Sequence, residues 1–288
     1  MSTSNLTNFD QRIGESVRLL RKSAGASQGD LAKELSLHQS AISRIEQGSQ
    51  SMTVTELAMV GQYFKVSLDH LIMGLIDYWQ VAESFGNDTF IPSRFRLFPF
   101  SKMRDPLPAF LEVVDTRSNA EIKSLLKNFG LELEMLKSAE QRIGVYFKLD
   151  LFKLMIRNGH FSKSLLAQIE QRTSNQMVQG LMNSTLKNQP SPQGILQSWI
   201  THHDEYESHF LPKIVETRKN KIVLTLTPNQ HMQEVDYLPI GKSICEYKLA
   251  YIKGLLSISA NTNSEIKESD CHFEGNHACT YHLQWKAS

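Results

Sequence analysis

The sequence predicts an α+β fold, with an all-α domain of five short helices followed by a larger α+β part. Three observations indicate this. Apolar residues recur at helical spacing through residues 9–74, they alternate over Lys221–Thr227, and residues 264–285 read as a closing hairpin. A chain of 288 residues fits two modest domains. We expect one domain at residues 1–75, a connecting segment at residues 76–140 and a second domain at residues 141–288.

The composition excludes several classes of protein. The chain has 31 Lys and Arg against 30 Asp and Glu, so it is no polycation that coats nucleic acid without regard to sequence. Its mean hydropathy is -0.31 and it lacks a long apolar run, so we expect no membrane span. The polar start lacks a signal peptide's layout, so we expect a cytoplasmic protein. Three cysteines argue against a disulfide framework and leave buried thiols, a reactive thiol or a metal site.

The five predicted helices of residues 9–74 each carry a start or stop signal. The first, about Phe9–Ser23, ends at Ala24-Gly25, and Gly48 follows the third, about Gln39–Gln47, where a left-handed cap is common. The other three are predicted to begin after N-cap side chains. These caps are Ser27, with Asp30 completing a capping box, then Thr53 and Ser67.

After Gly74 the composition changes. Residues 76–110 contain six Phe and four Pro, which forbids a long helix but is too aromatic for a free linker. We therefore expect an ordered connector. Helical patterns resume at about residues 119–136, 147–158 and 163–186, and the segment 189–192 breaks them.

The final third mixes helix and strand patterns. Lys221–Thr227 suits a strand, because Ile222, Leu224 and Leu226 alternate with Val223 and Thr225. Residues 240–259 suit a helix whose apolar face includes Cys245. In residues 264–285 we expect a hairpin with its turn at Glu274-Gly275-Asn276.

The stretch Ser27–Gly48 closely resembles the helix-turn-helix of the phage-repressor family, the lambda and Cro type. The likeness extends over five helices in the family's order and spacing. Physical chemistry agrees, because a helix that enters the major groove needs short or bidentate polar side chains on its outer face and apolar anchors beneath. Gln39, Ser40, Ser43 and Arg44 meet that need on the outer face. Ile42 and Ile45 are the anchors beneath. Taken alone, the same side chains could be a solvated helix face.

The resemblance implies roles for individual residues. Base-reading positions fall on Gln39, Ser40 and Arg44. Phosphate-contacting positions fall on Gln28, Ser43, Gln47 and Thr53. An ion pair between Arg21 and Glu46 is expected to brace the first helix against the third. Because residues 1–75 contain seven basic and seven acidic residues, one copy should bind DNA poorly, and we expect a homodimer on double-stranded operator DNA.

All three cysteines lie near the end of the chain, as Cys245-x25-Cys271-x7-Cys279. A hairpin turn at Gly275 would place Cys271 opposite Cys279, where both could share a tetrahedral ion with Cys245. Glu268 is a plausible fourth ligand if a bulge turns it to the same face. The competitors for that role are His272, His277 and His282. Three buried cysteines, or a disulfide between Cys271 and Cys279, are the alternatives.

Residues 245–279 also resemble the zinc-binding end of vinyl-4-reductase-type small-molecule-binding domains. These are the sensors of phenol-responsive bacterial activators, and they share a fold with vesicle-tethering subunits that hold an acyl chain. The resemblance implies a structural Zn²⁺ bound by Cys245, Glu268, Cys271 and Cys279, which would staple the C-terminal hairpin.

The likeness also implies a sensing pocket. Counted back from Cys245, the positions that hold a phenol hydroxyl in that family fall on Leu196 and Leu224, so phenol recognition is not expected. A small hydrophobic or aromatic ligand, such as an acyl chain, suits the residues that would line the pocket, although an aromatic stripe is more often core. These candidates are Trp199, Phe210, Leu224, Leu226 and Tyr237.

No phosphate loop, nucleophile elbow or HExxH helix is found, and His202-His203 with Asp204 and Glu205 is best read as a solvated helix face. We expect no enzyme.

The leading prediction is a one-component bacterial transcription regulator that binds operator DNA as a dimer and responds to a small hydrophobic ligand. The alternatives are a metal- or thiol-redox-responsive regulator without an organic ligand, and a C-terminal part that serves only to dimerise.

Overall fold

The computed structural model describes residues 3–99, 101–157, 162–206, 209–235, 240–258 and 264–285. The chain forms two compact units. Unit 1 comprises Met1–Ser93 and Lys123–Arg142, and unit 2 comprises Arg94–Ile122 and Ile143–Ser288. Residues 76–140, expected as a connector, contribute to both units. Among the described residues, no helix is both long and apolar enough to cross a lipid bilayer.

Unit 1 begins with the five predicted helices in the predicted order. They are α1 (Thr3–Ser23), α2 (Gln28–Glu34), α3 (Gln39–Glu46), α4 (Val54–Phe64) and α5 (Leu68–Met73). The helix α1 starts earlier than the expected Phe9, and the other boundaries agree closely. The predicted caps explain this agreement, because a side chain that satisfies a helix's free amide groups fixes where the helix begins.

Two capping boxes and one glycine define the ends of these helices. Ser27 Oγ accepts a hydrogen bond from Asp30 N at 3.1 Å, and Asp30 Oδ2 accepts one from Ser27 N at 2.8 Å. Thr53 and Glu56 form the same reciprocal pair at α4. Gly48 follows α3 with φ +69°, and a Cβ there would lie 2.7 Å from the Cα of Gln11. Glycine is therefore needed at position 48 both for its conformation and for the close approach of α1.

A single apolar core holds α1 to α5 together. Gly14 allows α1 and α3 to approach, since a Cβ there would lie 2.0 Å from the carbonyl oxygen of Ile45. The core side chains, each at most 5% exposed, include Ile13, Val17, Leu20, Leu31, Leu35, Ile42, Ile45, Leu57, Val60, Phe64 and Leu71. Burial of this stripe stabilises helices that are individually too short to persist in water.

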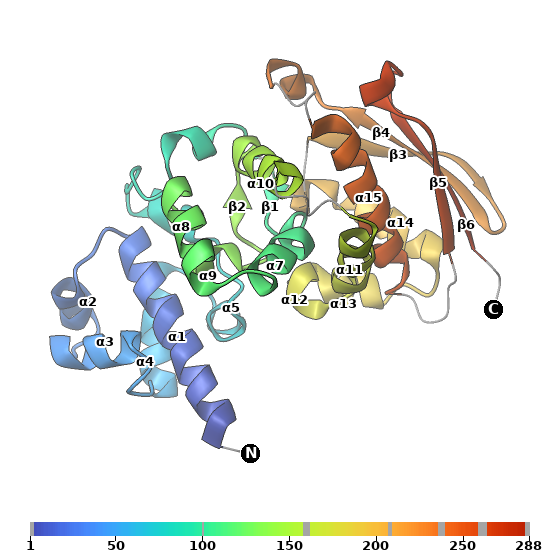
Figure 1. Ribbon diagram of the computed structural model, residues 1–288. Coiled ribbons are helices and arrows are strands. Elements are labelled where there is room, and N and C mark those ends of the chain that lie inside the picture. Colours follow the sequence, from blue (N-terminus) through green and yellow to red (C-terminus); the bar gives the residue numbers. More distant parts are fainter. Residues whose placement is uncertain are drawn as a thin grey trace. The chain divides into compact units, whose positions relative to one another are not determined.

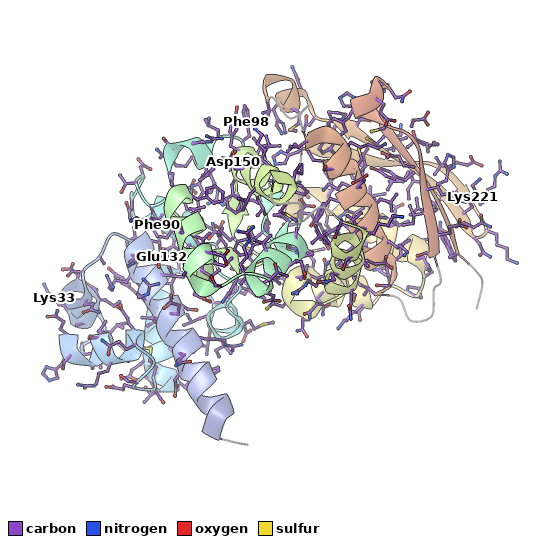
Figure 2. All side chains as sticks on the ribbon, viewed as in Figure 1. Lys33, Phe90, Phe98, Glu132, Asp150 and Lys221 are labelled. Atoms are coloured by element: carbon purple, nitrogen blue, oxygen red, sulfur yellow. The ribbon has the colours of Figure 1, made fainter. Side chains whose placement is uncertain are left out.

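Polar contacts join the rest of unit 1 to the first five helices, in addition to buried apolar side chains. It contains α6 (Tyr78–Ser84), most of α8 (Asn119–Phe129) and α9 (Leu133–Leu136). Glu132 lies at the start of α9 (Figures 1 and 2). It accepts hydrogen bonds from Arg18 and Lys22 of α1. Asp77, the N-cap of α6, pairs with Arg142, whose Nε lies 2.5 Å from Asp77 Oδ2. Residues 123–142 are thereby tied to the N-terminal helices.

Unit 2 contains a helical layer and a four-stranded sheet. Its helices are α7 (Leu107–Asp115), α10 (Val145–Arg157), α11 (Lys163–Thr173), α12 (Gln176–Gln179), α13 (Met182–Lys187), α14 (Pro192–Thr201) and α15 (Gly241–Leu256). A second, two-stranded sheet consists of β1 (Ser101–Lys102) and β2 (Arg142–Ile143), of which Arg142 is counted with unit 1. The helical pattern of residues 163–186 is divided into α11, α12 and α13, because Asn175 caps a new helix and Gly180 has φ +55°.

The main sheet is antiparallel, with strand order β3-β4-β6-β5. Its strands are β3 (Phe210–Arg218), β4 (Lys221–Pro228), β5 (Ser264–Asp270) and β6 (Cys279–Trp285). The predicted strand and closing hairpin are confirmed as β4 and the β5–β6 pair. The edge strand β3 was not predicted. The long helix α15 lies across one face of the sheet and packs on β5, α11 and α14 (Figure 1).

Candidate functional site

The helix α3 has one buried and one exposed face. Ile42 and Ile45 are at most 1% exposed and anchor it in the core of unit 1. The polar residues that the sequence marked as DNA-reading lie on the other side. Gln39, Ser40 and Arg44 are exposed, and Ser43 is half-buried. This is the arrangement that a helix needs to present polar groups to the edges of bases.

Side chains on neighbouring helices hold α3 in place. Arg21 of α1 forms a bidentate ion pair with Glu46, with Nε–Oε1 at 2.5 Å and Nη2–Oε2 at 2.9 Å, as predicted. Gln28 at the start of α2 donates from Nε2 to Glu46 Oε2 at 2.9 Å. The carboxylate of Glu46 therefore connects the first residue of α2 to both α1 and α3.

The remaining predicted phosphate contacts lie at helix ends. Gln47 follows α3 and donates to Ser43 Oγ at 3.3 Å. Thr53 is exposed and caps α4. A further polar residue, which the sequence did not single out, contacts this surface. Gln50 accepts a hydrogen bond from Arg44 Nε at 2.9 Å.

A second candidate site gathers the three cysteines and Glu268 of unit 2. One potential donor atom of each residue lies within 4.8 Å of the others. The residues come from separate elements: Cys245 from α15, Glu268 from β5, Cys271 from the residue after β5, and Cys279 from the start of β6. Cys245 Sγ lies 3.4 Å from Cys271 Sγ and 3.3 Å from Cys279 Sγ. All three cysteines are free and buried, so no disulfide joins Cys271 to Cys279.

A β-bulge places Glu268 in this cluster. Glu268 pairs with Tyr281 and Asp270 pairs with Thr280, so Ser269 is one residue in excess on β5. Without the extra residue, alternation would turn Glu268 away from Cys271. The bulge that the sequence argument required is thus present. Two of the competing histidines use a ring nitrogen in other contacts, since His282 Nε2 contacts Ser269 and His272 Nδ1 contacts the carbonyl of Asn276.

The electrostatics of the cluster favour a cation. Glu268 Oε1 is buried and makes no hydrogen bond among the described residues. Its other oxygen lies 3.5 Å from Lys242 Nζ. Hydrogen bonds from the Cys245 thiol and from the His272 amide lower the pKa of Cys279, whereas donation to Cys279 and burial raise the pKa of Cys245. These contacts favour the thiolate form of Cys279 over that of Cys245.

Phe273 and Gly241 bring the helix and the hairpin together at this site. A Cβ at Gly241, the first residue of α15, would lie 2.1 Å from Phe273 Cδ1. The ring of Phe273 therefore rests directly on the backbone at the start of α15. One turn further along the helix, Cys245 reaches the two cysteines of the hairpin. Glycine at 241 allows this approach.

The donor set fits a tetrahedral metal ion of the zinc type. Two Zn–S bonds of about 2.3 Å at a tetrahedral angle separate their sulfurs by about 3.8 Å. The sulfur distances of 3.3 and 3.4 Å are slightly shorter, so a small outward movement would accommodate the ion. The buried oxygen of Glu268 would supply the fourth ligand. These residues thus form a closed set of three sulfurs and one oxygen.

The residues predicted to line a ligand pocket lie in the core of unit 2. Trp199, Phe210, Leu224 and Leu226 are each at most 4% exposed, and Tyr237 lies outside the described residues. Leu224 and Leu226 share a face of β4, while Phe210 lies on β3 with its ring centroid 6.2 Å from that of Phe273. Leu196 is also fully buried.

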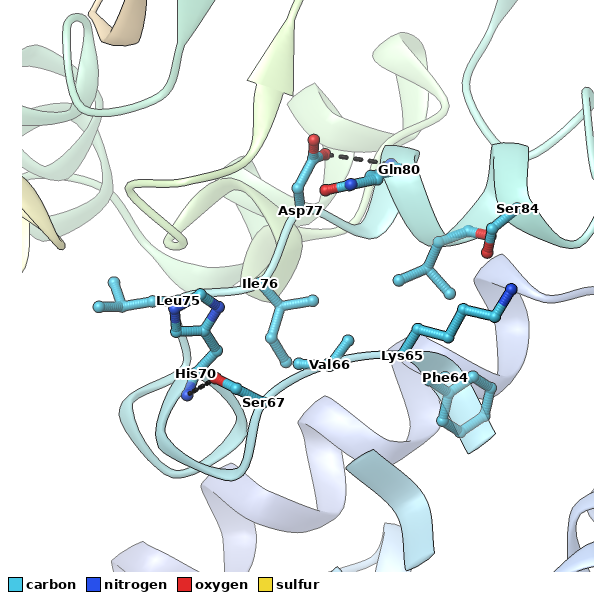
Figure 3. A pocket seen from close by; sticks show the side chains of 11 residues that line it. Phe64, Lys65, Val66, Ser67, His70, Leu75, Ile76, Asp77, Gln80 and Ser84 are labelled. Atoms are coloured by element: carbon cyan, nitrogen blue, oxygen red, sulfur yellow. Dashed lines mark hydrogen bonds between the residues drawn. The ribbon is translucent and has the colours of Figure 1, made fainter. Parts of the chain in front are cut away.

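A hollow of about 420 Å³ was not predicted and lies in unit 1 (Figure 3). Residues from the end of α4, the start of α5 and the α6 region line it. They include Phe64, Lys65, Val66, His70, Ile76 and Gln80. None of the predicted site residues belongs to it. No spacing rule in the sequence could have revealed a hollow whose walls come from three short segments.

Comparison with known proteins bears on the domain that contains α3. Residues 12–71 match the family model of a helix-turn-helix domain. No curated protein and no solved structure matches the chain. The match covers α2 and α3, and it supports a DNA-binding helix-turn-helix of the kind found in transcription regulators.

Proposed function

We propose that the chain is a one-component bacterial transcription regulator that binds operator DNA as a homodimer and responds to a small hydrophobic ligand. The observation that carries this proposal is the exposed polar face of α3 within a helix-turn-helix domain. Gln39, Ser40 and Arg44 would contact base edges in the major groove. The groups proposed to contact phosphates are Gln28, Ser43, Gln47 and Thr53.

Dimerisation follows from the charge of the DNA-binding part. Seven basic and seven acidic residues in positions 1–75 leave little net attraction to a phosphate backbone. Two copies on half-sites separated by about one helical turn, roughly 34 Å, would combine their base contacts. We assign the self-association to the part of the chain beyond residue 140.

Zinc is the metal that best suits the cysteine cluster. We propose that Cys245, Glu268, Cys271 and Cys279 bind one Zn²⁺, which joins α15 to the β5–β6 hairpin. Thiolates and a carboxylate give the site an excess of negative charge, part of which Lys242 balances. Four protein ligands leave no open position for a substrate, so the ion is structural and the proposal includes no enzymatic activity.

The ligand would bind in the apolar interior of unit 2. Burial of Trp199, Phe210, Leu224 and Leu226 favours an acyl chain or another hydrophobic molecule over a polar one. For such a molecule to regulate DNA binding, it must bind one arrangement of the dimer better than the other.

A selection from random-sequence DNA duplexes, followed by native mass spectrometry, tests the proposal. The full chain should enrich a sequence with two symmetric half-sites, and the complex should contain two chains. Failure to enrich any sequence would overturn the DNA-reading assignment.

Removal of zinc by a chelator should unfold the hairpin end. A folded, metal-free chain with altered DNA affinity would instead indicate a metal-sensing regulator.

A further inference from the structure

Arg44, the last base-reading residue of α3, has an intramolecular partner. Its Nε donates to Gln50 Oε1 at 2.9 Å. Arg44 is exposed, whereas Gln50 is half-buried. An exposed arginine ordinarily samples many rotamers, and ordering it on DNA costs free energy. The hydrogen bond that Arg44 donates to Gln50 restricts this freedom before DNA is bound.

The backbone that carries Gln50 is itself held by the end of α3. Ser49 N and Ser49 Oγ donate to the carbonyl of Arg44 at 2.9 and 3.1 Å. Gly48 adopts its left-handed conformation against Gln11. Residues 48 and 49 thus fold back onto the last turn of the helix, and this backbone places Gln50 within reach of the Arg44 side chain.

The hydrogen bond selects which face of the guanidinium can bind a base. A guanidinium can present Nε with one terminal nitrogen, or both terminal nitrogens end-on. Gln50 occupies Nε and leaves the end-on pair, for which the described residues provide no other hydrogen bond. Two parallel N–H donors match the O6 and N7 acceptors of guanine. Adenine offers an acceptor beside a donor and matches less well.

Gln50, the hydrogen-bond partner of Arg44, is also uncharged. A carboxylate at position 50 would bind the guanidinium more tightly, but its charge would oppose the DNA phosphates and cancel part of the attraction that Arg44 provides. An amide orients the arginine and leaves its charge intact.

We propose that Gln50 is a positioning residue that holds Arg44 for end-on, bidentate recognition of guanine, so that each operator half-site carries a G·C pair beneath Arg44. This inference rests on the proposed function and adds the base that Arg44 reads and the residue that orients it.

The test uses the full chain and the duplex enriched from a random library. Wild-type protein and Arg44→Ala are first compared on this duplex with each base pair changed in turn. The base pair beneath Arg44 is the one whose identity affects binding by the wild type but not by Arg44→Ala. It is then replaced by each of the other three pairs. Wild-type protein should prefer G·C by about 5- to 150-fold, the range expected for a bidentate contact. Gln50→Met, which keeps the length of the side chain but removes the acceptor, should reduce this preference to within about threefold.

Two controls separate positioning from a general structural effect. Gln50→Glu retains an acceptor, so it should keep the preference for G·C while binding every duplex more weakly. Gln50→Met should have no further effect in the Arg44→Ala background. An unchanged preference in Gln50→Met, or an Arg44-dependent base other than guanine, would overturn the inference. If the wild-type chain enriched no sequence, the proposed function itself would fail, so the two failures are distinguishable.

Discussion

Only two residues separate Glu268 on β5 from Cys271, which directly follows that strand, yet their donor atoms belong to the same buried cluster. The extra residue at Ser269 makes this possible by interrupting the alternation of β5. A bulge disturbs a ladder of hydrogen bonds, so it persists only where the surrounding structure compensates for it. A bound metal ion would provide that compensation.

Protein purified without added metal should contain one zinc ion per chain. Glu268→Gln should lower the affinity for zinc by more than about 100-fold, because it replaces a direct ligand. Even the loss of a residue that only hydrogen-bonds to a metal ligand lowers metal affinity by about 10- to 100-fold. Glu265→Gln is the matched control, because Glu265 is exposed on the same strand and pairs with Lys267. Elemental analysis and competition with a chromogenic chelator give the stoichiometry and affinity. Equal affinities in both variants would remove Glu268 from the ligand set.

The close contact between Gly241 and Phe273 should make the protein sensitive to a side chain at position 241. Gly241→Ala should destabilise the protein by about 1–3 kcal/mol, because its Cβ collides with the ring and forces α15 away from the hairpin. The cost should largely disappear in the Phe273→Ala background, where the space is open. Urea unfolding of the four proteins in this cycle measures the coupling. Additive effects of the two substitutions would contradict the contact.

The ion pair of Arg21 with Glu46 should contribute to the stability of the helix-turn-helix. The Arg21 and Glu46 side chains are 12% and 4% exposed. Glu46→Gln would leave the guanidinium without its counter-charge, at a cost of about 3 kcal/mol. Replacement of both residues by Met should cost far less, since neither variant side chain carries a charge. Thermal unfolding provides the comparison, and equal losses in the single and double variants would argue against the pair.

Stability of unit 1 should fall at acid pH in a way that depends on Glu132. Burial raises the pKa of Glu132, but hydrogen bonds from Arg18 and Lys22 outweigh it and lower the pKa below its usual range. The contacts therefore stabilise the fold above the unfolded-state pKa of about 4.3, and this contribution is lost as the pH falls through the lower, folded-state pKa.

Glu132→Gln removes this contribution. The variant should lose up to about 1 kcal/mol at pH 7 and less at pH 3. The control is Glu134→Gln within α9, where the partner Lys137 is half-buried and lies only one turn away. Urea unfolding at the two pH values tests the difference. If the free energies of unfolding of Glu132→Gln and wild type differed by the same amount at pH 7 and pH 3, the ion pairs of Glu132 would not cause the pH dependence.

Local signals explain what the sequence could predict. The caps at Ser27, Thr53 and Ser67 act within one helical turn, so their residues alone defined three helix starts in unit 1. The spacing of Cys271, Gly275 and Cys279 likewise predicted a hairpin whose ends could share an ion with Cys245.

Contacts distant in sequence explain what could not be predicted. The strand β3 was missed because Pro212 and exposed residues such as Lys213 obscure its alternation, and only its pairing with β4 defines it. The attachment of residues 123–142 to unit 1 depends on Glu132 meeting Arg18, which has no signature in the sequence. Gln50 follows the helix-turn-helix motif, and only the folded backbone brings its amide to Arg44.

Sequence-specific DNA binding through α3 can be measured as one ratio. This ratio compares the dissociation constants of the full chain for its enriched operator and for a random duplex of equal length, at about 150 mM salt. We predict that the operator binds at least about 1,000-fold more tightly, and that Arg44→Ala removes a large part of this difference. A ratio near one, or a ratio that Arg44→Ala leaves unchanged, would contradict the assignment of α3 as the DNA-reading helix.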